Sequence, residues 1–564
     1  MTILEINRKR LKELINKELN INELEEIFFD MGMELDKYDK EMLYIDITPD
    51  RPDMLSDEGL ARAIRYYLEI DKFKDYKFED SGVEIFVDKK VEAVRPYIGA
   101  FIAKNLKMNK GKLNDIIETQ EKLHGTFCRN RKSAAIGIYP LDKIMPPLYY
   151  TAESPNKISF KPLNTDIVMT GFEILEKHEK GIKYGFLLKN AKEYPLLIDS
   201  KKNILSMPPI INSGLIGKVD ESTENVIVEV TGITESRVEQ LINILSAMFA
   251  DIGAKIYTIK TNYEKYIKVY PSMKQNSIEL SNDYVKKVLG LNIELKEIEK
   301  LLARMGYKVT KINKEENKVE LVVPFYRADV LHEIDIVDDI ARAYKLSNIK
   351  PEIPAVSTFG NSLRKTKVTE FIRTLLVGMG FTEALTLALT NTKYQYDNMN
   401  IEAKDTKDII NIPEAKAKEI NTIRTWILPE LIRALKANES FGIPIKLFEI
   451  NDVCAKDDRT ETNYKNITKL SVIITNQQAT FTDIKQILNM LMNILNVKYI
   501  VEEQIHPSFI EGRSGCINIK DKNNKEHKDI GIIGEISPNV LENFAWRYPI
   551  AAFEINIEPF INLI

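Results

Sequence analysis

Residues 324–344, PFYRADVLHEIDIVDDIARAY, carry side chains whose types and spacing suit metal chemistry. In a helix that begins near Val330, successive residues turn by about 100°, so carboxylates three or four positions apart share one face. That face would carry Asp335, Asp338, Asp339 and Arg342. Asp329, just before the helix, could cap it or turn back towards the same face. Because Mg²⁺ prefers oxygen ligands, the candidate metal ligands are Asp329, Asp335, Asp338 and Asp339.

A second explanation of these carboxylates needs no metal. Acidic side chains favour the N-terminal end of a helix, where the helix dipole is positive, and they also favour a solvated helix face. Glu333 points away from the shared face and is a poorer candidate ligand. Spacing alone leaves both explanations open.

A second polar group lies in two segments, residues 204–214 (ILSMPPIINSG) and 226–233 (VIVEVTGI). Its candidate binding residues are Asn212, Ser213, Glu229 and Thr231. Their donors and acceptors could hold the polar end of an amino acid or a phenolic hydroxyl. The alternative is structural, with Asn-Ser in a turn and Glu-x-Thr on an exposed strand face. His124 and Cys128 lie four positions apart but lack a third partner, so we do not interpret them as a nucleophile pair.

The charge balance limits what the chain can bind. It has 79 basic and 83 acidic residues, a formal net charge of −4, which argues against a general nucleic-acid coat. Local RNA contacts could use the basic residues 104–112 and 129–132, although such clusters also occur in solvated loops. Three cysteines without CxxC or CxxH spacing predict neither a zinc site nor a disulfide framework. Without an apolar run of about 18 residues or a signal segment, we expect a cytoplasmic protein.

The elements that position these residues predict an α+β multidomain fold. At 564 residues the chain exceeds one hydrophobic core and should hold domains of roughly 100–200 residues. Residues 1–75 form an N-terminal helical and strand region, and residues 76–262 a mixed α/β domain. Residues 263–350 form a small helix-hairpin-helix module with the acidic helix. Residues 351–564 form an antiparallel sheet domain flanked by helices.

Local patterns place several elements inside these domains. Residues 6–31 have helical spacing, and helices are expected over 56–68 and 365–379. A β-rich sequence predicts a strand over residues 384–390. In the motif DITPDRPD, Pro49 and Pro52 fix the backbone and present Asp50, Arg51 and Asp53 outward. These residues would contact a partner or RNA, or the turn would be a rigid structural feature.

Six motifs in order along the chain resemble the β chain of phenylalanyl-tRNA synthetase in its short archaeal or eukaryotic cytosolic form. The first is DITPDRPDMLSDEGLARAI at residues 46–64, followed by LSMPPIINS at 205–213 and the acidic segment 327–344. The others are NTIRTWILPELIRAL at 421–435, KLFEINDV at 446–453, and HPSFIEGRSG with IGEISP between 506 and 538. The resemblance therefore extends nearly from end to end.

The resemblance implies that residues 76–262 are an editing domain, which hydrolyses tyrosine mistakenly attached to the phenylalanine tRNA. Glu229 would sense the phenolic hydroxyl, while Asn212, Ser213 and Thr231 would position the ester or a water. Related chains often have Asp where this one has Glu229. The resemblance also implies that Asp329, Asp335, Asp338 and Asp339 are Mg²⁺-associated positions, at a site shared with or adjacent to the α chain.

The last domain, by the same resemblance, has a class II synthetase-like fold without catalysis. Class II catalysis needs arginines on antiparallel strands to clamp ATP, and Arg424 and Arg513 lack that context. The smaller α chain would carry adenylation and aminoacylation in an α₂β₂ tetramer that binds ATP, phenylalanine and tRNA(Phe). Residues 368–390 would help to form the interface between the α and β chains, or would be an ordinary helix and strand of the core, and the two roles are compatible.

Two other functional classes remain open from the sequence. The chain would be a free-standing hydrolase of mischarged tRNA if it deacylates without a partner. It would be a noncatalytic RNA-binding scaffold if it neither hydrolyses nor joins a synthetase.

Overall fold

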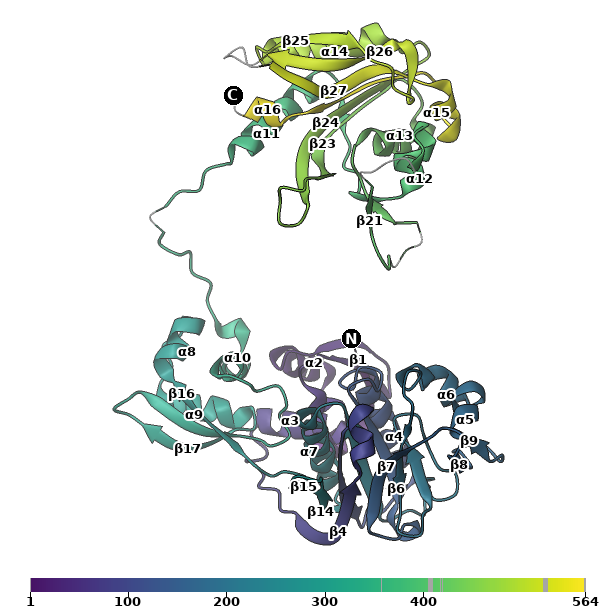
Figure 1. The fold of residues 1–564 in the computed structure, drawn as a ribbon. Coiled ribbons are helices and arrows are strands. Elements are labelled where there is room, and N and C mark those ends of the chain that lie inside the picture. Colours follow the sequence, from purple (N-terminus) through teal and green to yellow (C-terminus); the bar gives the residue numbers. More distant parts are fainter. Residues whose placement is uncertain are drawn as a thin grey trace. The chain divides into compact units, whose positions relative to one another are not determined.

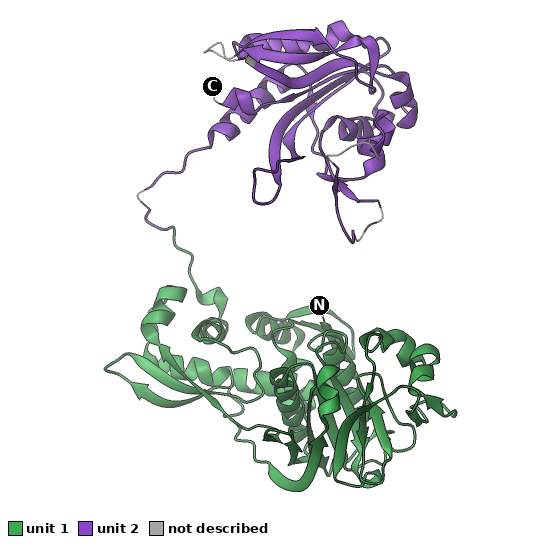
Figure 2. Ribbon diagram, in the orientation of Figure 1, with its two compact units in different colours: residues 1–353 green, residues 354–564 purple. Residues whose placement is uncertain are grey.

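The computed structural model describes residues 2–356, 358–403, 409–415, 417, 419–520 and 526–561. It divides into two compact units, Met1–Ile353 and Pro354–Ile564, each of which mixes helices and sheets (Figures 1 and 2). The expected α+β multidomain fold is therefore confirmed at this level.

Unit 1 begins with a three-stranded antiparallel sheet in the order β1-β3-β2. Its strands are β1 (Thr2–Asn7), β2 (Glu34–Tyr38) and β3 (Met42–Ile47), and its helices are α1 (Arg8–Ile15), α2 (Ile21–Asp30) and α3 (Asp57–Tyr67). The helical spacing of residues 6–31 corresponds to two helices, because Asn16 takes a left-handed backbone conformation at φ 58° and the Asn20 side chain caps α2. Ser56 caps α3 as its sequence predicts.

The centre of unit 1 is a ten-stranded sheet in the order β12-β11-β10-β7-β4-β14-β5-β13-β6, with β15 beside β14 (Figure 1). Its strands are β4 (Glu79–Val87), β5 (Tyr97–Lys104), β6 (Ala134–Pro140), β7 (Leu148–Glu153), β10 (Tyr194–Ile198), β11 (Ile204–Met207), β12 (Ile211–Asn212), β13 (Val226–Gly232), β14 (Lys255–Asn262) and β15 (Ile267–Tyr270). The accompanying elements are α4 (Lys110–Gly125), β8 (Ser159–Phe160), β9 (Met169–Thr170), α5 (Gly171–Lys177), α6 (Glu179–Tyr184) and α7 (Glu235–Asp251). Strand β13 lies between β5 and β6, and α7 packs on β5 and β13.

A small module with a three-stranded sheet completes unit 1. The order is β16-β18-β17, with β16 (Asn276–Ser281), β17 (Lys308–Asn313) and β18 (Lys318–Val323). The helices are α8 (Asn282–Leu289), α9 (Leu295–Arg304) and α10 (Glu333–Tyr344). The predicted helices, hairpin and acidic helix are confirmed, although α10 begins at Glu333 and not near Val330.

One hydrophobic core connects all three parts of unit 1. It includes Ile45 of the first sheet, Phe249 of α7 and Ile340 of α10. Because this core crosses the boundaries expected near residues 75 and 262, the parts pack on one another, and the four-domain division stays a prediction.

Unit 2 contains a seven-stranded sheet in the order β19-β23-β24-β28-β27-β26-β25, antiparallel apart from the β19–β23 pair. Its strands are β19 (Thr382–Glu383), β23 (Ile445–Lys456), β24 (Tyr464–Thr475), β25 (Lys498–Glu503), β26 (Phe509–Lys520), β27 (Glu526–Ile536) and β28 (Ile550–Asn556). A smaller sheet contains β20 (Leu389–Thr390), β21 (Ile410–Asn411) and β22 (Thr422–Ile423). The helices are α11 (Arg364–Gly378), α12 (Thr392–Gln395), α13 (Leu428–Ala437), α14 (Phe481–Ile494), α15 (Pro538–Asn543) and α16 (Glu558–Ile561).

The expected strand over residues 384–390 is not continuous. The chain leaves the seven-stranded sheet after β19 and joins the smaller sheet at β20. Between them, Thr386 donates a hydrogen bond to Glu449 instead of continuing a ladder. The expected antiparallel sheet with flanking helices is present, and its class II likeness stays a prediction.

Candidate functional site

A pocket of about 380 Å³ opens beside β6, β13 and the segment from β11 to β12. Its volume lies within the roughly 300–1,000 Å³ that small-molecule sites occupy. Much of its wall is aliphatic, including Ile116, Ile136 and Ile138. The polar or charged residues in the wall are Gln120, Glu121, Arg131, Asn164, Lys180, Ser206, Asn212, Lys218 and Glu229. The pocket therefore combines an apolar surface with a few polar groups.

Glu229 lies at the centre of β13, between β5 and the edge strand β6, and is 3% exposed. Its Oε1 accepts a hydrogen bond of 2.8 Å from the Tyr139 hydroxyl. Its Oε2 is buried and has no hydrogen-bond partner among the described residues. Burial raises the pKa of Glu229 from its ordinary 4.5 to about 7, against smaller opposing effects from the Tyr139 hydrogen bond and the Arg95 charge. The carboxyl group thus changes charge near neutral pH.

Gly137 supplies the space that this carboxyl group occupies. It lies directly opposite Glu229 in the β6–β13 ladder. A Cβ at position 137 would clash with both Tyr139 Oη and Glu229 Oε1. The glycine therefore allows a long acidic side chain to lie over the sheet at this point.

The other expected editing residues divide into two groups. Asn212 lines the pocket, and its Nδ2 donates to the Ile138 carbonyl at 3.4 Å. Ser213 and Thr231 are buried outside the lining of the pocket. Ser213 Oγ accepts from its own turn, and Thr231 Oγ1 accepts from Arg95 Nε at 2.9 Å. The structure brings Asn212 and Glu229 to the pocket, whereas Ser213 and Thr231 are buried and bonded elsewhere.

Arg131 was expected in a basic cluster for RNA, but it is 7% exposed. Its guanidinium donates to the carbonyls of Pro209 and Ile210, at 3.1 and 3.0 Å, and to Glu121 at 3.0 Å. Arg131 is therefore bound inside the protein and is not part of an exposed basic surface, because its guanidinium is taken up by these three partners. Arg131 instead holds the diproline segment of the pocket wall.

Sequence reasoning also missed Tyr139, although a signal was available. In β6, residues two apart share one side of the sheet, so Tyr139 follows Gly137 on the same side. Cross-strand pairing of Gly137 with Glu229 then brings the phenol to the carboxyl group. That pairing could not be read from the sequence.

His124 and Cys128 are both buried near this region and do not form a nucleophile pair. Burial lowers the pKa of His124 to about 4, and its Nε2 accepts from the Ile136 amide at 2.8 Å. Burial raises the pKa of the Cys128 thiol to about 12. A neutral imidazole with an occupied nitrogen and a protonated thiol are unsuited to nucleophilic catalysis.

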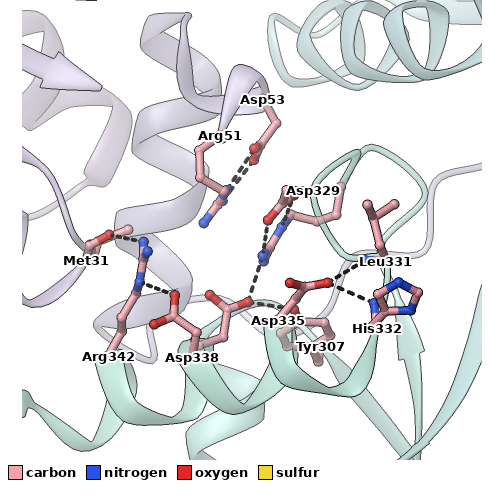
Figure 3. A network of polar contacts seen from close by, with 12 residues as sticks. Met31, Arg51, Asp53, Tyr307, Asp329, Leu331, His332, Asp335, Asp338 and Arg342 are labelled. Atoms are coloured by element: carbon pink, nitrogen blue, oxygen red, sulfur yellow. Dashed lines mark hydrogen bonds and ion pairs between the residues drawn. The ribbon is translucent and has the colours of Figure 1, made fainter. Parts of the chain in front are cut away.

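The acidic helix α10 lies elsewhere in unit 1, and Figure 3 shows the surroundings of its carboxylates. Asp335 faces the beginning of the helix, where its Oδ2 accepts from the amides of Leu331 and His332 at 2.7 and 2.8 Å (Figure 3). Asp335 therefore acts as a helix cap, as the dipole explanation expects.

Asp329 and Asp339 both bind Arg327. The Arg327 guanidinium donates to both oxygens of Asp329, at 2.8 and 2.7 Å, and to Asp339 Oδ2 at 2.7 Å. The Tyr307 hydroxyl donates to the same Asp339 oxygen at 2.5 Å. A buried guanidinium thus takes the place between these two carboxylates that a metal ion was expected to take.

Asp338 pairs with a different arginine. It forms an ion pair of 2.9 Å with Arg342 across one turn of α10, and its side chain is 60% exposed. Arg342 also donates to the Met31 carbonyl at 3.0 Å (Figure 3). Among residues 2–356 and the other described parts, no three or more His, Cys, Asp or Glu side chains are grouped to hold a metal ion. The four expected ligands therefore do not converge, and the residues of this chain do not fit a Mg²⁺ site by themselves.

The DITPDRPD turn was expected to present Arg51 and Asp53 outward. Both are buried, and Arg51 forms two hydrogen bonds of 2.9 Å with Asp53. Burial by itself raises the pKa of Asp53, but the Arg51 guanidinium outweighs it and lowers the pKa to about 2. The expectation was wrong for these two residues because they pair with each other inside the fold, and of the three only Asp50 is exposed.

In unit 2, the two arginines considered for ATP binding are separately engaged. Arg424 is fully buried and pairs with Glu449 at 2.8 Å. Arg513 was expected outside a strand, but it lies on the antiparallel strand β26, where it pairs with Glu535 at 2.6 Å. Each of these two arginines therefore has a protein partner of its own.

Residues 368–390 expose apolar side chains, since Leu385 and Leu387 are 78% and 74% exposed. This segment therefore has an apolar surface.

Comparison with known proteins covers almost the whole chain. Family models match residues 1–70 (Phe-tRNA synthetase beta subunit B1 domain), 278–345 (tRNA synthetase B5 domain) and 349–557 (Phenylalanyl tRNA synthetase beta chain CLM domain). The Phenylalanine–tRNA ligase beta subunit of Thermococcus gammatolerans is 37% identical over 98% of both chains, and that of Methanocaldococcus jannaschii is 36% identical over 99% of this chain and 100% of the relative.

A solved structure agrees with unit 1. The N-terminal fragment of the phenylalanyl-tRNA synthetase beta subunit from Pyrococcus horikoshii matches with a TM-score of 0.58 and 37% identity, over 61% of this chain and 99% of the fragment. No helix among the described residues is both long and apolar enough to cross a membrane. On these matches, the chain belongs to the family of phenylalanine–tRNA ligase β subunits.

Proposed function

We propose that the chain supports attachment of phenylalanine to tRNA(Phe) and that its pocket hydrolyses tyrosine from mischarged tRNA(Phe). Identity to the β subunits over nearly the full length supports the first role. The observation that carries the second is Glu229, a buried carboxyl group in a pocket wall whose Oε2 has no hydrogen-bond partner in the part of the chain that the structure describes.

The physical need for hydrolysis comes from the weakness of steric selection. An apolar pocket for phenylalanine rejects a ligand with one additional hydroxyl by only about 100-fold. A second site that binds the hydroxyl can select tyrosine strongly, because phenylalanine leaves its buried polar group without a partner. Glu229 Oε2 is such a group, and it would accept the phenolic hydrogen bond.

The other residues of the pocket favour direct attack by water. Asn212 lines the pocket and offers an amide for the ester or the water. His124 has its Nε2 occupied by the Ile136 amide, and the buried Cys128 thiol stays protonated, so the pair does not suit a covalent intermediate. Water therefore adds to the ester carbonyl, the bond to the ribose oxygen breaks, and tyrosine and free tRNA are released. Ser213 and Thr231 contribute by supporting the wall.

Synthesis belongs to the assembled enzyme. An α chain carries adenylation and aminoacylation, and an α₂β₂ tetramer binds ATP and phenylalanine. The exposed Leu385 and Leu387 support a role of residues 368–390 in the contact between the α and β chains. Arg424 and Arg513, which are engaged with acidic partners, support a noncatalytic unit 2. The Mg²⁺ dependence of the reaction is assigned to the tetramer, which we place in the cytoplasm.

The first test measures charging of tRNA(Phe) with phenylalanine by this chain, by an α chain and by their mixture. Activity in the mixture only supports the subunit role. Charging by this chain alone refutes the division of labour, and a stable complex without charging favours the hydrolase or scaffold classes.

The second test measures release of tyrosine from Tyr-tRNA(Phe) by the tetramer. Glu229→Gln should slow release and leave phenylalanine charging intact, whereas Glu221→Gln, an exposed substitution of the same chemistry, should change neither. Equal loss of both activities in Glu229→Gln would indicate misfolding and contradict a specific editing role.

A further inference from the structure

We propose that Tyr139 is a positioning residue for Glu229: it binds one carboxyl oxygen and leaves the other for the phenolic hydroxyl of the substrate. This inference rests on the proposed editing function and names the group that makes the site selective.

The sheet fixes Tyr139 against Glu229. Glu229 and Gly137 are directly opposite in the β13–β6 ladder, and Tyr139 lies two residues further along β6 on the same side. The Tyr139 ring is fully buried, and its hydroxyl is 2.8 Å from Glu229 Oε1. Because Gly137 has no Cβ, no side chain of that residue lies between the Tyr139 hydroxyl and the Glu229 carboxyl group. The hydrogen bond is therefore imposed by the strand register and not by a flexible loop.

Tyr139 is also the only described residue that donates a hydrogen bond to this carboxyl group. The charged and titratable groups that face Glu229 are Arg95 in the turn before β5, Tyr139 on β6 and Tyr150 on β7. The Arg95 guanidinium is bound to Thr231 and to the Arg131 carbonyl, and the Tyr150 hydroxyl is bound to the Arg95 carbonyl. On β5, the residue opposite Glu229 is Ala100, which is not titratable.

This arrangement gives the two carboxyl oxygens different roles. Oε1 is occupied by a donor that belongs to the protein, so the orientation of the carboxyl group is fixed before a ligand arrives. Oε2 remains as the acceptor for a ligand hydroxyl. Because Oε2 is buried, leaving it without a hydrogen bond costs free energy. A phenylalanyl group cannot supply that hydrogen, whereas a tyrosyl group can.

The test uses the tetramer and the ratio of Tyr-tRNA(Phe) to Phe-tRNA(Phe) hydrolysis, because the ratio cancels the pH dependence of ester hydrolysis itself. Tyr139→Phe keeps the ring and removes the hydroxyl. We expect the ratio to fall about tenfold, the loss typical of one hydrogen bond to a charged group. The pH at which the ratio reaches half its maximum should also rise, because the donor that favours ionised Glu229 is gone. Tyr149→Phe, on the exposed face of β7, is the matched control and should change neither.

A double-mutant cycle separates positioning from mere packing. If Tyr139 acts through Glu229, Tyr139→Phe has no further effect on the ratio in a Glu229→Gln background. Additive losses, or an unchanged pH midpoint in Tyr139→Phe, would overturn the proposal. In addition, 3-fluorotyrosine at position 139 keeps the hydroxyl and makes it a stronger donor, so the midpoint should move down; no movement would also count against the proposal.

The experiment distinguishes a tetramer that lacks editing activity from one in which Tyr139 has no role. If the wild-type tetramer charges phenylalanine but does not hydrolyse Tyr-tRNA(Phe), the editing proposal is rejected, and the inference on Tyr139 is rejected with it. If the wild type hydrolyses but Tyr139→Phe behaves as wild type, only the role of Tyr139 is rejected.

Discussion

Two regions of unit 1 contain buried carboxyl groups with opposite kinds of hydrogen-bond partner. In the arginine–aspartate network, formed by Arg51, Asp53, Arg327, Asp329 and Asp339, each carboxylate is bound by a guanidinium. In the pocket, Glu229 is bound by a neutral phenol, and one of its oxygens has no partner among the described residues. The network uses its charges to hold the fold together, whereas the pocket keeps an acceptor for a ligand.

The protonation of the two regions differs accordingly. The Arg51 guanidinium holds the pKa of Asp53 at about 2, while burial without a bound cation brings the pKa of Glu229 to about 7. Burial raises the pKa of both acids, so the difference comes from the partner. An acid bound to a cation keeps its negative charge, whereas an acid without a bound cation can change its protonation when a ligand binds or the pH changes.

The largest effect is expected where the network is broken. Asp339→Ala leaves Arg327 buried with one partner fewer and Tyr307 without its acceptor. We expect a loss of about 3–5 kcal/mol in the free energy of unfolding of unit 1, typical of a broken buried ion pair. Urea unfolding followed by circular dichroism measures it.

The chain offers two controls for this experiment. Asp338→Ala removes an exposed pair on the same helix and should cost about 0.5 kcal/mol or less. Both tryptophans, Trp426 and Trp546, lie in unit 2, so their fluorescence reports on that unit. Equal effects of Asp338→Ala and Asp339→Ala would contradict the distinction between exposed and buried members of the helix.

The second effect concerns pH. The pKa of Glu229 is about 7 in the folded state against 4.5 ordinarily, so the folded state binds more protons between these values. Stability should therefore fall as pH rises from about 4.5 to 7, by roughly 3 kcal/mol in all, and then level off. Glu229→Gln should remove this loss. The measurement is the urea midpoint of unit 1 as a function of pH in both proteins.

Asp53 should show the opposite sign. Its pKa is lowered from 3.8 to about 2 in the folded state, so its stabilising contribution is present above pH 3.8 and is lost as pH falls towards 2. If Glu229→Gln and Asp53→Asn changed the slope of stability against pH in the same direction, the comparison between the two regions would be contradicted.

Local patterns predicted the elements well because they depend on neighbours in the sequence. The period of α10 placed Asp335, Asp338 and Asp339 on a helix, and Ser56 marked the beginning of α3. Partners were harder to predict because they come from distant segments. Arg51 and Asp53 were expected at the surface, yet they lie beside a second buried arginine far away in sequence, Arg327.

The pocket shows the same limit. Its motif identified Asn212 and Glu229, which line the pocket, but motif membership did not separate them from Ser213 and Thr231, which are buried and do not line it. Strand alternation could not have separated Glu229 from Thr231, because residues two apart on β13 share one side of the sheet. They differ in their partners, since Thr231 Oγ1 is occupied by Arg95. Tyr139 was missed because the register between β6 and β13 decides its contact with Glu229.

A smaller effect is expected at the beginning of α10. Asp335→Ala removes the acceptor of two backbone amides and should lower stability by about 1 kcal/mol, the usual value of a helix cap. Asp335→Asn keeps an acceptor and should lose less. If both substitutions cost as much as Asp339→Ala, Asp335 would belong to the buried network and not to the helix end.

The smallest effect is expected from Mg²⁺ on the isolated chain. Asp329 and Asp339 are bound to Arg327, Asp335 is bound to backbone amides, and Asp338 is an exposed carboxylate beside Arg342. A hard divalent cation needs several oxygen ligands around one point, and these side chains diverge. Adding Mg²⁺ or a chelator should therefore leave the urea midpoint of unit 1 unchanged, because an ion that does not bind the folded state cannot stabilise it. A saturable rise that Asp338→Ala abolishes would show that the cation can displace an arginine, and the network would then resemble the pocket in keeping a carboxylate for a ligand.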